Sequence, residues 1–312
     1  MSTGTSSLNS TDATAVLRAL ARRLADSYIA HTSPRAILLV GSAATGGADE
    51  YSDLDLLVYH DQVPPERAVA ETPRELGTER YSGTPWSDDS GEPDERGYSE
   101  RYCLGGIECQ VGHMSVGAFE REITRLVVDH EFTEELLKIM SGLHEGLPLF
   151  GEEPIERWRR NAGYTEELRR KTIEKRWTLF PWWYFQERLR SRDATVWRYD
   201  VLVQSAYSLV GVLAALNRLY FSTLEFKRAS RLLSRLEVAP PDFAGRLTSL
   251  FESDEQRSTA ELERLVGETQ ALVAERFPEI DLALQWGGKP TPPGERESPW
   301  TLHQTQRVAR KS

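Results

Sequence analysis

Apolar residues near the start of the chain recur at intervals of three and four, the spacing of one helical face. This stripe comprises Val16, Leu17, Leu20, Leu24 and Tyr28. Asp12 can cap the first turn, and we expect the helix to end near Pro34. Continuous apolar runs follow at 36–40 and 54–59, and each is typical of a buried strand. The pattern therefore predicts one helix followed by two strands.

A second pair of strands is predicted around Gly105-Gly106, a two-residue turn signal for a β-hairpin. The two strand-like segments that flank the turn are 99–104 and 107–114. Closing the turn at these glycines places Cys103 opposite Glu108. Since side chains alternate along a strand, Cys109 points to the face away from Cys103. We therefore expect no disulfide between the two cysteines of the chain.

A long polar segment, residues 76–97, precedes this hairpin and follows a short helix expected to begin near Pro64. Its acidic residues cluster near its end, at Asp88, Asp89, Glu92, Asp94 and Glu95. Loops of this length in compact domains are often lids or disordered insertions, and the sequence leaves both interpretations open.

From Ser115 onwards the spacing becomes helical almost without a break. The predicted helices are 116–129, 134–145, 165–192 with a break at Pro181, 195–220, 225–236 and 258–277. The Gly- and Pro-containing stretch 146–151 indicates a domain boundary, with disordered tails at both ends. The predicted organisation is an α/β domain at 11–148, a helical domain at 149–286, and tails at 1–10 and 287–312. This is an α+β arrangement: an N-terminal α/β core followed by an all-helical bundle.

The composition fits an enzyme of about two domains. Of the 312 residues, 39% are hydrophobic and 28% charged, and the mean hydropathy of -0.48 argues against wholesale disorder and against a membrane protein. The N-terminus lacks the pattern of a signal peptide, so we expect a cytoplasmic location. A net charge of -10 disfavours indiscriminate binding to nucleic acid and suits a cationic small substrate.

The connection between the first two strands carries the candidate chemistry. Gly41 leaves the strand in a turn that tolerates no bulk, and Ser42 offers a hydroxyl and an amide to phosphate oxygens, so this turn predicts a cradle for a polyphosphate. Asp53 and Asp55 lie two residues apart at the head of the next strand, and both carboxylates project from one face. Such a pair, together with substrate phosphates, favours Mg²⁺.

A third acid completes this candidate site. In a strand with Ile107, Cys109 and Val111 facing inward, Glu108 is the acid on the other face. It is a candidate for binding a second metal or for taking the proton from an attacking hydroxyl, and the alternative is an exposed strand residue. Arg101, on the same predicted face, either contacts phosphate or, more simply, is an arginine of an edge strand.

Together these motifs resemble the nucleotidyltransferase superfamily of the DNA polymerase β type, particularly the adenylyltransferases that act on aminoglycoside and lincosamide antibiotics. The resemblance covers about residues 36–112, in the order strand, Gly-Ser-x-x-x-Gly, Ser-Asp-x-Asp and a later strand with one acid. It implies an α/β core with a mixed sheet, Mg²⁺ as cofactor, and ATP or another nucleoside triphosphate as co-substrate. On this likeness Asp53 and Asp55 are the metal-binding pair and Glu108 is the third acid and catalytic base. Gly41 and Ser42 form the triphosphate loop.

Further along, Asn217-Arg218-x-Tyr220 and Lys227 are similar to the helical domain of some bacterial members of this superfamily. Residues 157–192 hold eleven Lys/Arg against four Asp/Glu, with several aromatic residues alongside. This segment either binds RNA or nucleotide phosphates, or divides between core aromatics and a solvated basic face. The second interpretation follows from its helical spacing. We expect His113 and His144 to be structural.

The sequence thus predicts an enzyme that moves a nucleoside monophosphate, AMP first, from a nucleoside triphosphate to a hydroxyl of a small molecule, with release of pyrophosphate. The expected acceptor is an antibiotic such as an aminoglycoside or a lincosamide, with a cationic molecule favoured, bound by a monomer or a homodimer. Neither nucleic acid nor a membrane is expected as a partner. Two alternatives stay open: a toxin-like enzyme that modifies a protein or tRNA, and a catalytically silent sensor that binds the nucleotide.

Overall fold

A computed structural model of the chain describes residues 10–87, 90–92, 96–180, 193–282, 285–286 and 289–290. By contacts, residues up to 175 together with 210–238 form one compact unit, and 176–209 together with 239 onwards form a second. The predicted disordered tails, 1–10 and 287–312, lie outside the described residues except for Ser10 and 289–290.

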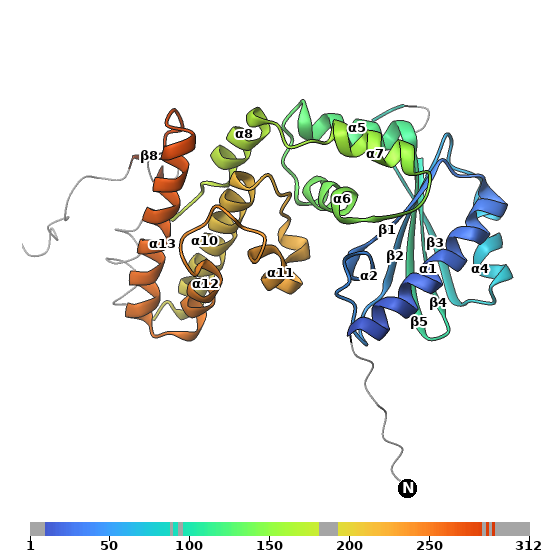
Figure 1. Cartoon of the computed structure of the whole chain (residues 1–312), viewed down its shortest axis with the longest axis horizontal. Coiled ribbons are helices and arrows are strands. Elements are labelled where there is room, and N and C mark those ends of the chain that lie inside the picture. Colours follow the sequence, from blue (N-terminus) through green and yellow to red (C-terminus); the bar gives the residue numbers. More distant parts are fainter. Residues whose placement is uncertain are drawn as a thin grey trace, which may run out of the picture. The chain divides into compact units, whose positions relative to one another are not determined.

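The first unit is built on a six-stranded mixed sheet in the order β3-β4-β5-β2-β1-β6 (Figure 1). Its strands are β1 (Ala36–Val40), β2 (Leu54–His60), β3 (Glu79–Ser87), β4 (Arg96–Leu104), β5 (Ile107–Ser115) and β6 (Leu147–Phe150). The central pair β2 and β5 is parallel and all other pairs are antiparallel. The predicted strands and the α+β fold class are confirmed.

The hairpin of β4 and β5 has the predicted register, with Cys103 opposite Glu108 across the glycine turn. Cys109 lies opposite Tyr102 and is buried, and both cysteines are free thiols. Burial raises the pKa of the Cys109 thiol to about 12. The expectation of no disulfide is confirmed.

Part of the polar segment 76–97 is not a loop, since β3 pairs antiparallel with β4. Most of the side chains of β3 are exposed on both faces, so its sequence lacks the alternation that marks a half-buried strand. A bulge between Glu79 and Ser82, with Arg80 at a φ of 55°, and Pro85 also interrupt its pattern. With β3 in place, Arg101 of β4 is not on an edge strand. The acidic residues Asp88, Asp89, Asp94 and Glu95 lie outside the described residues.

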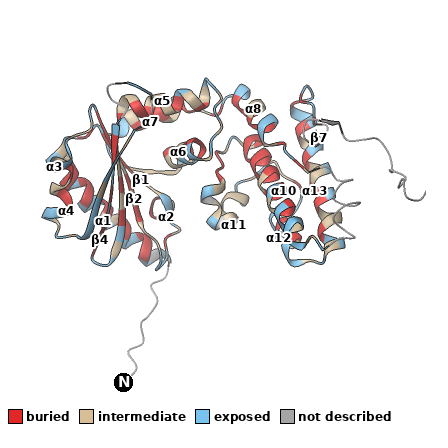
Figure 2. Ribbon diagram, turned by 180° about the vertical axis from the view of Figure 1, so that it is seen from behind, coloured by how far each residue is buried: buried red, intermediate tan, exposed pale blue. Residues whose placement is uncertain are grey.

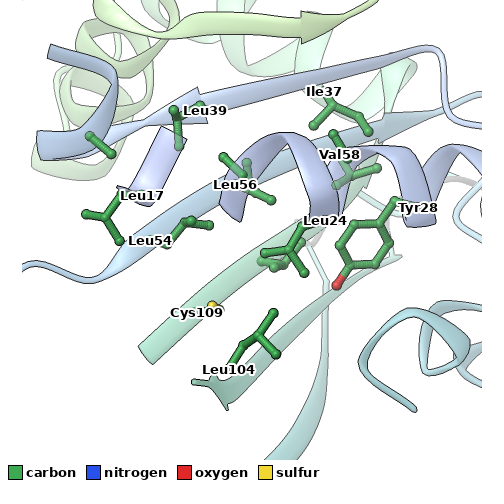
Figure 3. Packing of buried hydrophobic residues seen from close by; sticks show 14 of the residues in the cluster. Leu17, Leu24, Tyr28, Ile37, Leu39, Leu54, Leu56, Val58, Leu104 and Cys109 are labelled. Atoms are coloured by element: carbon green, nitrogen blue, oxygen red, sulfur yellow. The ribbon is translucent and has the colours of Figure 1, made fainter. Parts of the chain in front are cut away.

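Helix α1 (Ser10–Thr32) covers one face of the sheet. Figure 3 shows its side chains packed on the strands, Leu17, Leu24 and Tyr28 against Ile37, Leu39, Leu54, Leu56, Val58 and Cys109. Each fully buried leucine contributes roughly 1.5–3 kcal/mol to this interface. Val16 differs from the predicted stripe, because it is 47% exposed. The short helices α3 (Glu66–Val69) and α4 (Glu71–Glu75) also contact α1.

Helices α5 (Val116–Val127), α6 (Glu134–Glu145) and α7 (Glu152–Asn161) cover the opposite face of the sheet. Ser115 and Thr133 cap the first two, because their side-chain oxygens accept hydrogen bonds from the amides of Ala118 and Leu136. The buried ring of Tyr59 in β2 lies 4.7 Å from Phe119 and 4.8 Å from Trp158 between ring centroids. Helices thus lie on both faces of the sheet, and Tyr59 of β2 is buried beneath Phe119 and Trp158.

The rest of the described chain is mainly helical. It comprises α8 (Glu166–Arg176), α10 (Thr195–Leu216), the 3₁₀ helix η2 (Thr223–Arg228), α11 (Ala229–Leu233), α12 (Phe243–Glu252), α13 (Glu255–Arg276) and the two-residue strands β7 (Gln285–Trp286) and β8 (Lys289–Pro290). In the part of the predicted helix 165–192 that precedes the expected break at Pro181, α8 ends at Arg176 and 177–180 are not helical. Its remainder, 181–192, lies outside the described residues.

The two compact units do not follow the boundary expected at 146–151, because the chain returns to the first unit at 210. Domains at 11–148 and 149–286 stay a prediction. Helix α10 is the one described helix with the length and apolar composition to cross a membrane, and 72% of its apolar window is buried (Figure 2). Such burial is typical of a core helix in a soluble protein.

Beneath α1 lies a buried polar network, centred on Glu100 of β4. Its carboxylate accepts a hydrogen bond from the Tyr28 hydroxyl at 2.6 Å, and its Oε2 lies 2.9 Å from Nε2 of His113. The other ring nitrogen of His113 lies 3.1 Å from Nε2 of His60. The pKa of His60 is lowered to about 3, mainly by burial and secondly by the neighbouring His113. Asp61 raises this pKa and offsets part of the shift.

This depressed pKa predicts a pH-dependent stability. Below about pH 6.5 the unfolded chain binds a proton at His60 that the folded protein does not, so the free energy of unfolding falls by up to about 1.4 kcal/mol per pH unit. Replacing His60 by glutamine should remove about 2 kcal/mol of the loss between pH 6.5 and 5. Urea unfolding at several pH values measures this. Parallel curves for the wild type and His60→Gln would contradict the assignment.

Candidate functional site

A cavity of about 500 Å³ opens in the first unit at the end of β1 and the head of β2. Four of the predicted site residues line it: Gly41, Ser42, Asp53 and Asp55. The fifth, Glu108, is not among the lining residues. The opposite wall comes from α6, η2 and α11, which are far along the sequence.

The turn after β1 is a five-residue helix, α2 (Gly41–Thr45). Gly41 adopts a φ of 72°, in the left-handed region that favours glycine, and a Cβ there would lie 2.8 Å from Oδ2 of Asp55. The absence of a side chain at Gly41 is thus what lets the Asp55 carboxylate sit against the backbone of the turn.

Helix α1 holds this turn from the side. The Arg18 guanidinium donates to the carbonyl oxygens of Ala43 at 2.9 Å and Ala44 at 2.7 Å. The Ala48 amide donates to the Thr14 hydroxyl at 3.3 Å. Sequence analysis missed Arg18, because its partners are 25 and 26 residues away and no spacing rule joins them. The sequence marks Arg18 only as a cation beside the apolar stripe of the helix.

Strand pairing places the acids. Asp55 lies opposite Val40 of β1 on one side and Gln110 of β5 on the other. The Gln110 amide donates to Oδ2 of Asp53 at 3.0 Å and to Oε1 of Glu108 at 3.4 Å, so it bridges the two acids across β2 and β5. Gln110 did not enter the predicted site, although its parity in β5 is that of Glu108.

Glu108 lies on the predicted face and its side chain is 48% exposed. Its carboxylate forms an ion pair with Arg101 at 3.3 Å. Arg101 thus pairs with an acid. This differs from both predicted roles, which were a contact with phosphate and an arginine of an edge strand. The assignment of Glu108 as third acid and base remains a prediction.

The donor set fits Mg²⁺ at the aspartate pair. Asp53 and Asp55 line the cavity with carboxylate oxygens, which are hard ligands. Because Gly41 has no Cβ, the space next to Oδ2 of Asp55 is not filled by a side chain of the turn. Over the described ranges, no three His, Cys, Asp or Glu side chains are gathered closely enough to hold a metal by themselves. Magnesium commonly takes one or two carboxylates plus substrate phosphates, so the pair meets its requirement and Glu108 is not needed as a ligand.

The facing wall is basic. Among the side chains that the structure describes, its four cations are Lys138 of α6, Lys227 of η2, and Arg231 and Arg235 at and just beyond α11. The two arginines form ion pairs with Glu145 at the end of α6. Neither lysine forms an ion pair with another residue in the described part of the chain. The cavity is therefore acidic on its sheet side and basic on its helix side.

Three side chains from the motif 217–220 tie this basic wall in place. Each donates to a backbone carbonyl: Asn217 to Val238 at 3.0 Å, Arg218 to Tyr164 at 2.7 Å, and Tyr220 to Ala162 at 2.9 Å. The Ser222 hydroxyl then donates to the Glu134 carbonyl at 2.8 Å at the start of α6. These residues are structural, and they position Lys227 and the two arginines.

The remaining candidates are structural too. His144 stacks on Tyr220 with ring centroids 5.4 Å apart, and burial lowers its pKa. In the basic segment 157–192, Trp158 and Trp177 are buried, and the ion pairs of its arginines include Arg159 with Glu156 and Arg169 with Glu166. The aromatic residues from Trp182 to Phe185 lie outside the described residues.

Residues 18–108 match a family model described as a nucleotidyltransferase domain. The match starts within α1, ends within β5 and includes all five predicted site residues. The match covers less than a third of the chain. None of the curated proteins compared with the chain matches it.

Solved structures show remote overall likeness. A nucleotidyltransferase-like protein from Exiguobacterium sibiricum 255-15 is 13% identical, with 85% of this chain and 81% of that chain covered and a TM-score of 0.32. Cid1, an RNA terminal uridylyl transferase, is 16% identical with coverages of 64% and 47% and a TM-score of 0.28. Terminal uridylyl transferase 4 from Trypanosoma brucei is 12% identical with coverages of 89% and 74% and a TM-score of 0.26. This chain spans about half the length of Cid1.

The contact between Gly41 and Asp55 can be tested by substitution. Gly41→Ala should destabilise the protein by about 1–2 kcal/mol through its left-handed φ, and further through the clash with the carboxylate. Gly46→Ala is a matched control, because Gly46 has a φ of 80° and nothing within 4 Å of its Cβ position. Unfolding free energies measure both. In an Asp55→Ala background the excess cost at Gly41 should vanish, and its persistence would show that Asp55 is not the obstacle.

Proposed function

We propose that the protein is a Mg²⁺-dependent nucleotidyltransferase that moves a nucleoside monophosphate, AMP from ATP first, to a hydroxyl of a small molecule and releases pyrophosphate. The observation that carries this proposal is the division of charge in the cavity: Asp53 and Asp55 on the sheet side, four cations on the helix side. A metal-bound polyphosphate has the complementary polarity, with its cation toward the acids and its phosphate oxygens toward the bases.

The polyphosphate would lie between the Gly41-Ser42 turn and the basic wall. Ser42 lines the cavity on the same side as the aspartates and offers its hydroxyl as a donor. Lys138 and Lys227 face it without a competing ion pair among the described residues, so their charges are available to phosphate oxygens. These groups would hold the triphosphate in one orientation, which is the larger part of catalysis in phosphoryl transfer.

Asp53 and Asp55 would hold the magnesium, which supplies charge neutralisation at the α-phosphate and at the leaving pyrophosphate. Arg18 and Gly41 keep the Asp55 carboxylate and the phosphate turn in register with each other. Gln110 orients the Asp53 carboxylate through its amide. The protein's own contribution is therefore a fixed frame of oxygens on one side and nitrogens on the other.

Glu108 is the proposed base. It would take the proton of the acceptor hydroxyl as the acceptor oxygen bonds to the α-phosphorus, while the bond from that phosphorus to the bridging oxygen breaks and pyrophosphate leaves. The Gln110 amide links Glu108 to Asp53. The half-exposed carboxylate of Glu108 is accessible to an incoming acceptor.

The acceptor is proposed to be a small molecule, with a cationic antibiotic such as an aminoglycoside as the first candidate. The net charge of -10 supports this choice over RNA, because a polyanion would be repelled outside the local basic wall. Action in the cytoplasm, by a monomer or a homodimer, is part of the same proposal.

The reaction is tested by pyrophosphate release with Mg²⁺ and each nucleoside triphosphate, against aminoglycosides, lincosamides, tRNA and the protein itself. Asp53→Asn and Asp55→Asn should each lower the rate at least about a thousandfold, because the metal loses a charged ligand. Asp61→Asn, an exposed acid at the far end of β2 that pairs with Arg35, is the control and should leave the rate unchanged.

Release that requires an aminoglycoside or lincosamide and is lost in both variants supports the proposal. Release with tRNA or with the protein itself identifies the toxin-like alternative instead. Nucleotide binding without release under any condition, unchanged in Asp55→Asn, would favour the sensor.

The basic wall makes a separate prediction about binding. Lys138→Gln and Lys227→Gln should each weaken ATP binding about tenfold, since each removes one cation from the phosphate oxygens. Isothermal titration calorimetry with Mg²⁺-ATP measures this. Lys171→Gln in α8, where the lysine pairs with Glu174, should bind as the wild type does. Equal affinities in all four proteins would place the triphosphate elsewhere.

A further inference from the structure

Glu145 is the one acid among the described residues that line the basic side of the cavity. It is the last residue of α6, and its side chain is 22% exposed. Its Oε2 lies 2.9 Å from the Arg231 guanidinium, and its Oε1 pairs with Arg235. All three residues line the cavity. One carboxylate thus forms ion pairs with two of the four described cations that face Ser42 and the aspartates.

Helix stability does not explain an acid at this position. The C-terminal end of a helix carries partial negative charge, which disfavours a carboxylate and favours a cation. The end of α6 already has its cation, because Arg159 donates to the carbonyl oxygens of Leu143 at 2.9 Å and Gly146 at 2.7 Å. Glu145 is therefore oriented by the two arginines of the cavity and adds nothing to the capping of its own helix.

We propose that Glu145 is an internal competitor for the polyphosphate: it holds Arg231 and Arg235 in the empty site, yields them to the triphosphate, and takes them back as pyrophosphate leaves. This inference rests on the proposed function, since it assumes that a polyphosphate binds here. The ligand class that the exchange requires is an anion of several charges.

The exchange follows from the chemistry of the wall. Lys138 and Lys227 attract the anion first, because within the described ranges no acid is paired with them. Arg231 and Arg235 then face two acceptors, the Glu145 carboxylate and the phosphate oxygens, and both offer geometry suited to a guanidinium. The affinity for the polyphosphate is lowered, because the arginines must give up part of their attraction to the Glu145 carboxylate when they bind the anion. The same attraction favours departure of the product.

The test is the binding of inorganic tripolyphosphate and pyrophosphate without metal, by calorimetry at fixed pH and ionic strength. Glu145→Gln keeps the shape of the side chain and removes its charge. We expect it to bind both anions about tenfold more tightly than the wild type, and, in the enzymatic assay, pyrophosphate to become a correspondingly stronger product inhibitor. Glu122→Gln, which removes an acid paired with Arg125 on α5, is the matched control and should bind as the wild type does.

A second variant gives the result an independent check. In a protein carrying Arg231→Gln and Arg235→Gln, anion binding should be weaker than in the wild type, and adding Glu145→Gln should no longer tighten it. This pair of proteins isolates the coupling between the carboxylate and the arginines. Thermal unfolding of each protein confirms that it is folded.

The outcomes separate the two hypotheses. If the wild type binds neither anion, in the absence or in the presence of Mg²⁺, the polyphosphate site of the proposed function is contradicted, and the role of Glu145 with it. If the wild type binds them and Glu145→Gln binds them equally or more weakly, the proposed function stands, and Glu145 is only a structural tie between α6 and α11. Tightening that survives loss of both arginines would also overturn the inference.

Discussion

The close approach of the Asp55 carboxylate to the Gly41 backbone is the contact on which the site depends. It requires β2 to pair with β1 in one register, since a shift by one residue would turn Asp55 to the α1 face and an apolar neighbour to the cavity. That register is fixed by the burial of alternate residues of β2 under α1 and by the aromatic contacts of Tyr59 on the other face. The same helix that buries the strand also holds the phosphate turn through Arg18. The contacts that pack α1 on the sheet therefore also fix the geometry of the site.

Sequence reasoning succeeded where a local rule decides the outcome. The apolar runs of β1 and β2, the glycine turn of the hairpin and the helical stripe of α1 each depend on neighbours within a few residues. Reasoning failed at β3, whose side chains are mostly exposed and whose pairing is set by β4 through backbone hydrogen bonds. The prediction also overran at α8, where the helical spacing continues towards the expected break at Pro181 and the helix ends at Arg176. No local pattern marks the pairing of β3 or the end of α8 at this residue.

The candidate site shows the same division. The residues between Gly41 and Asp55 are close in sequence and could be assigned from their spacing. Lys138 and the residues of η2 and α11 reach the cavity only because the segment 210–238 returns to the first unit, and that return is fixed by contacts of Asn217, Arg218 and Tyr220 with distant carbonyls. The sequence pointed to Asn217, Arg218, Tyr220 and Lys227 as a group, but only the structure distinguishes the three ties from the one cation that faces the cavity.

The two edges of the sheet have a consequence for self-association. The outer strand β3 carries a bulge and Pro85, and the outer strand β6 has four residues and contains Pro148. Proline offers no N–H to a further strand, and a bulge or a very short edge leaves little continuous backbone for pairing. Neither edge is therefore a template for strand addition, which guards the folded protein against edge-to-edge aggregation. Among the described residues, helices and loops are therefore better suited than the sheet edges to contact between two copies of this chain.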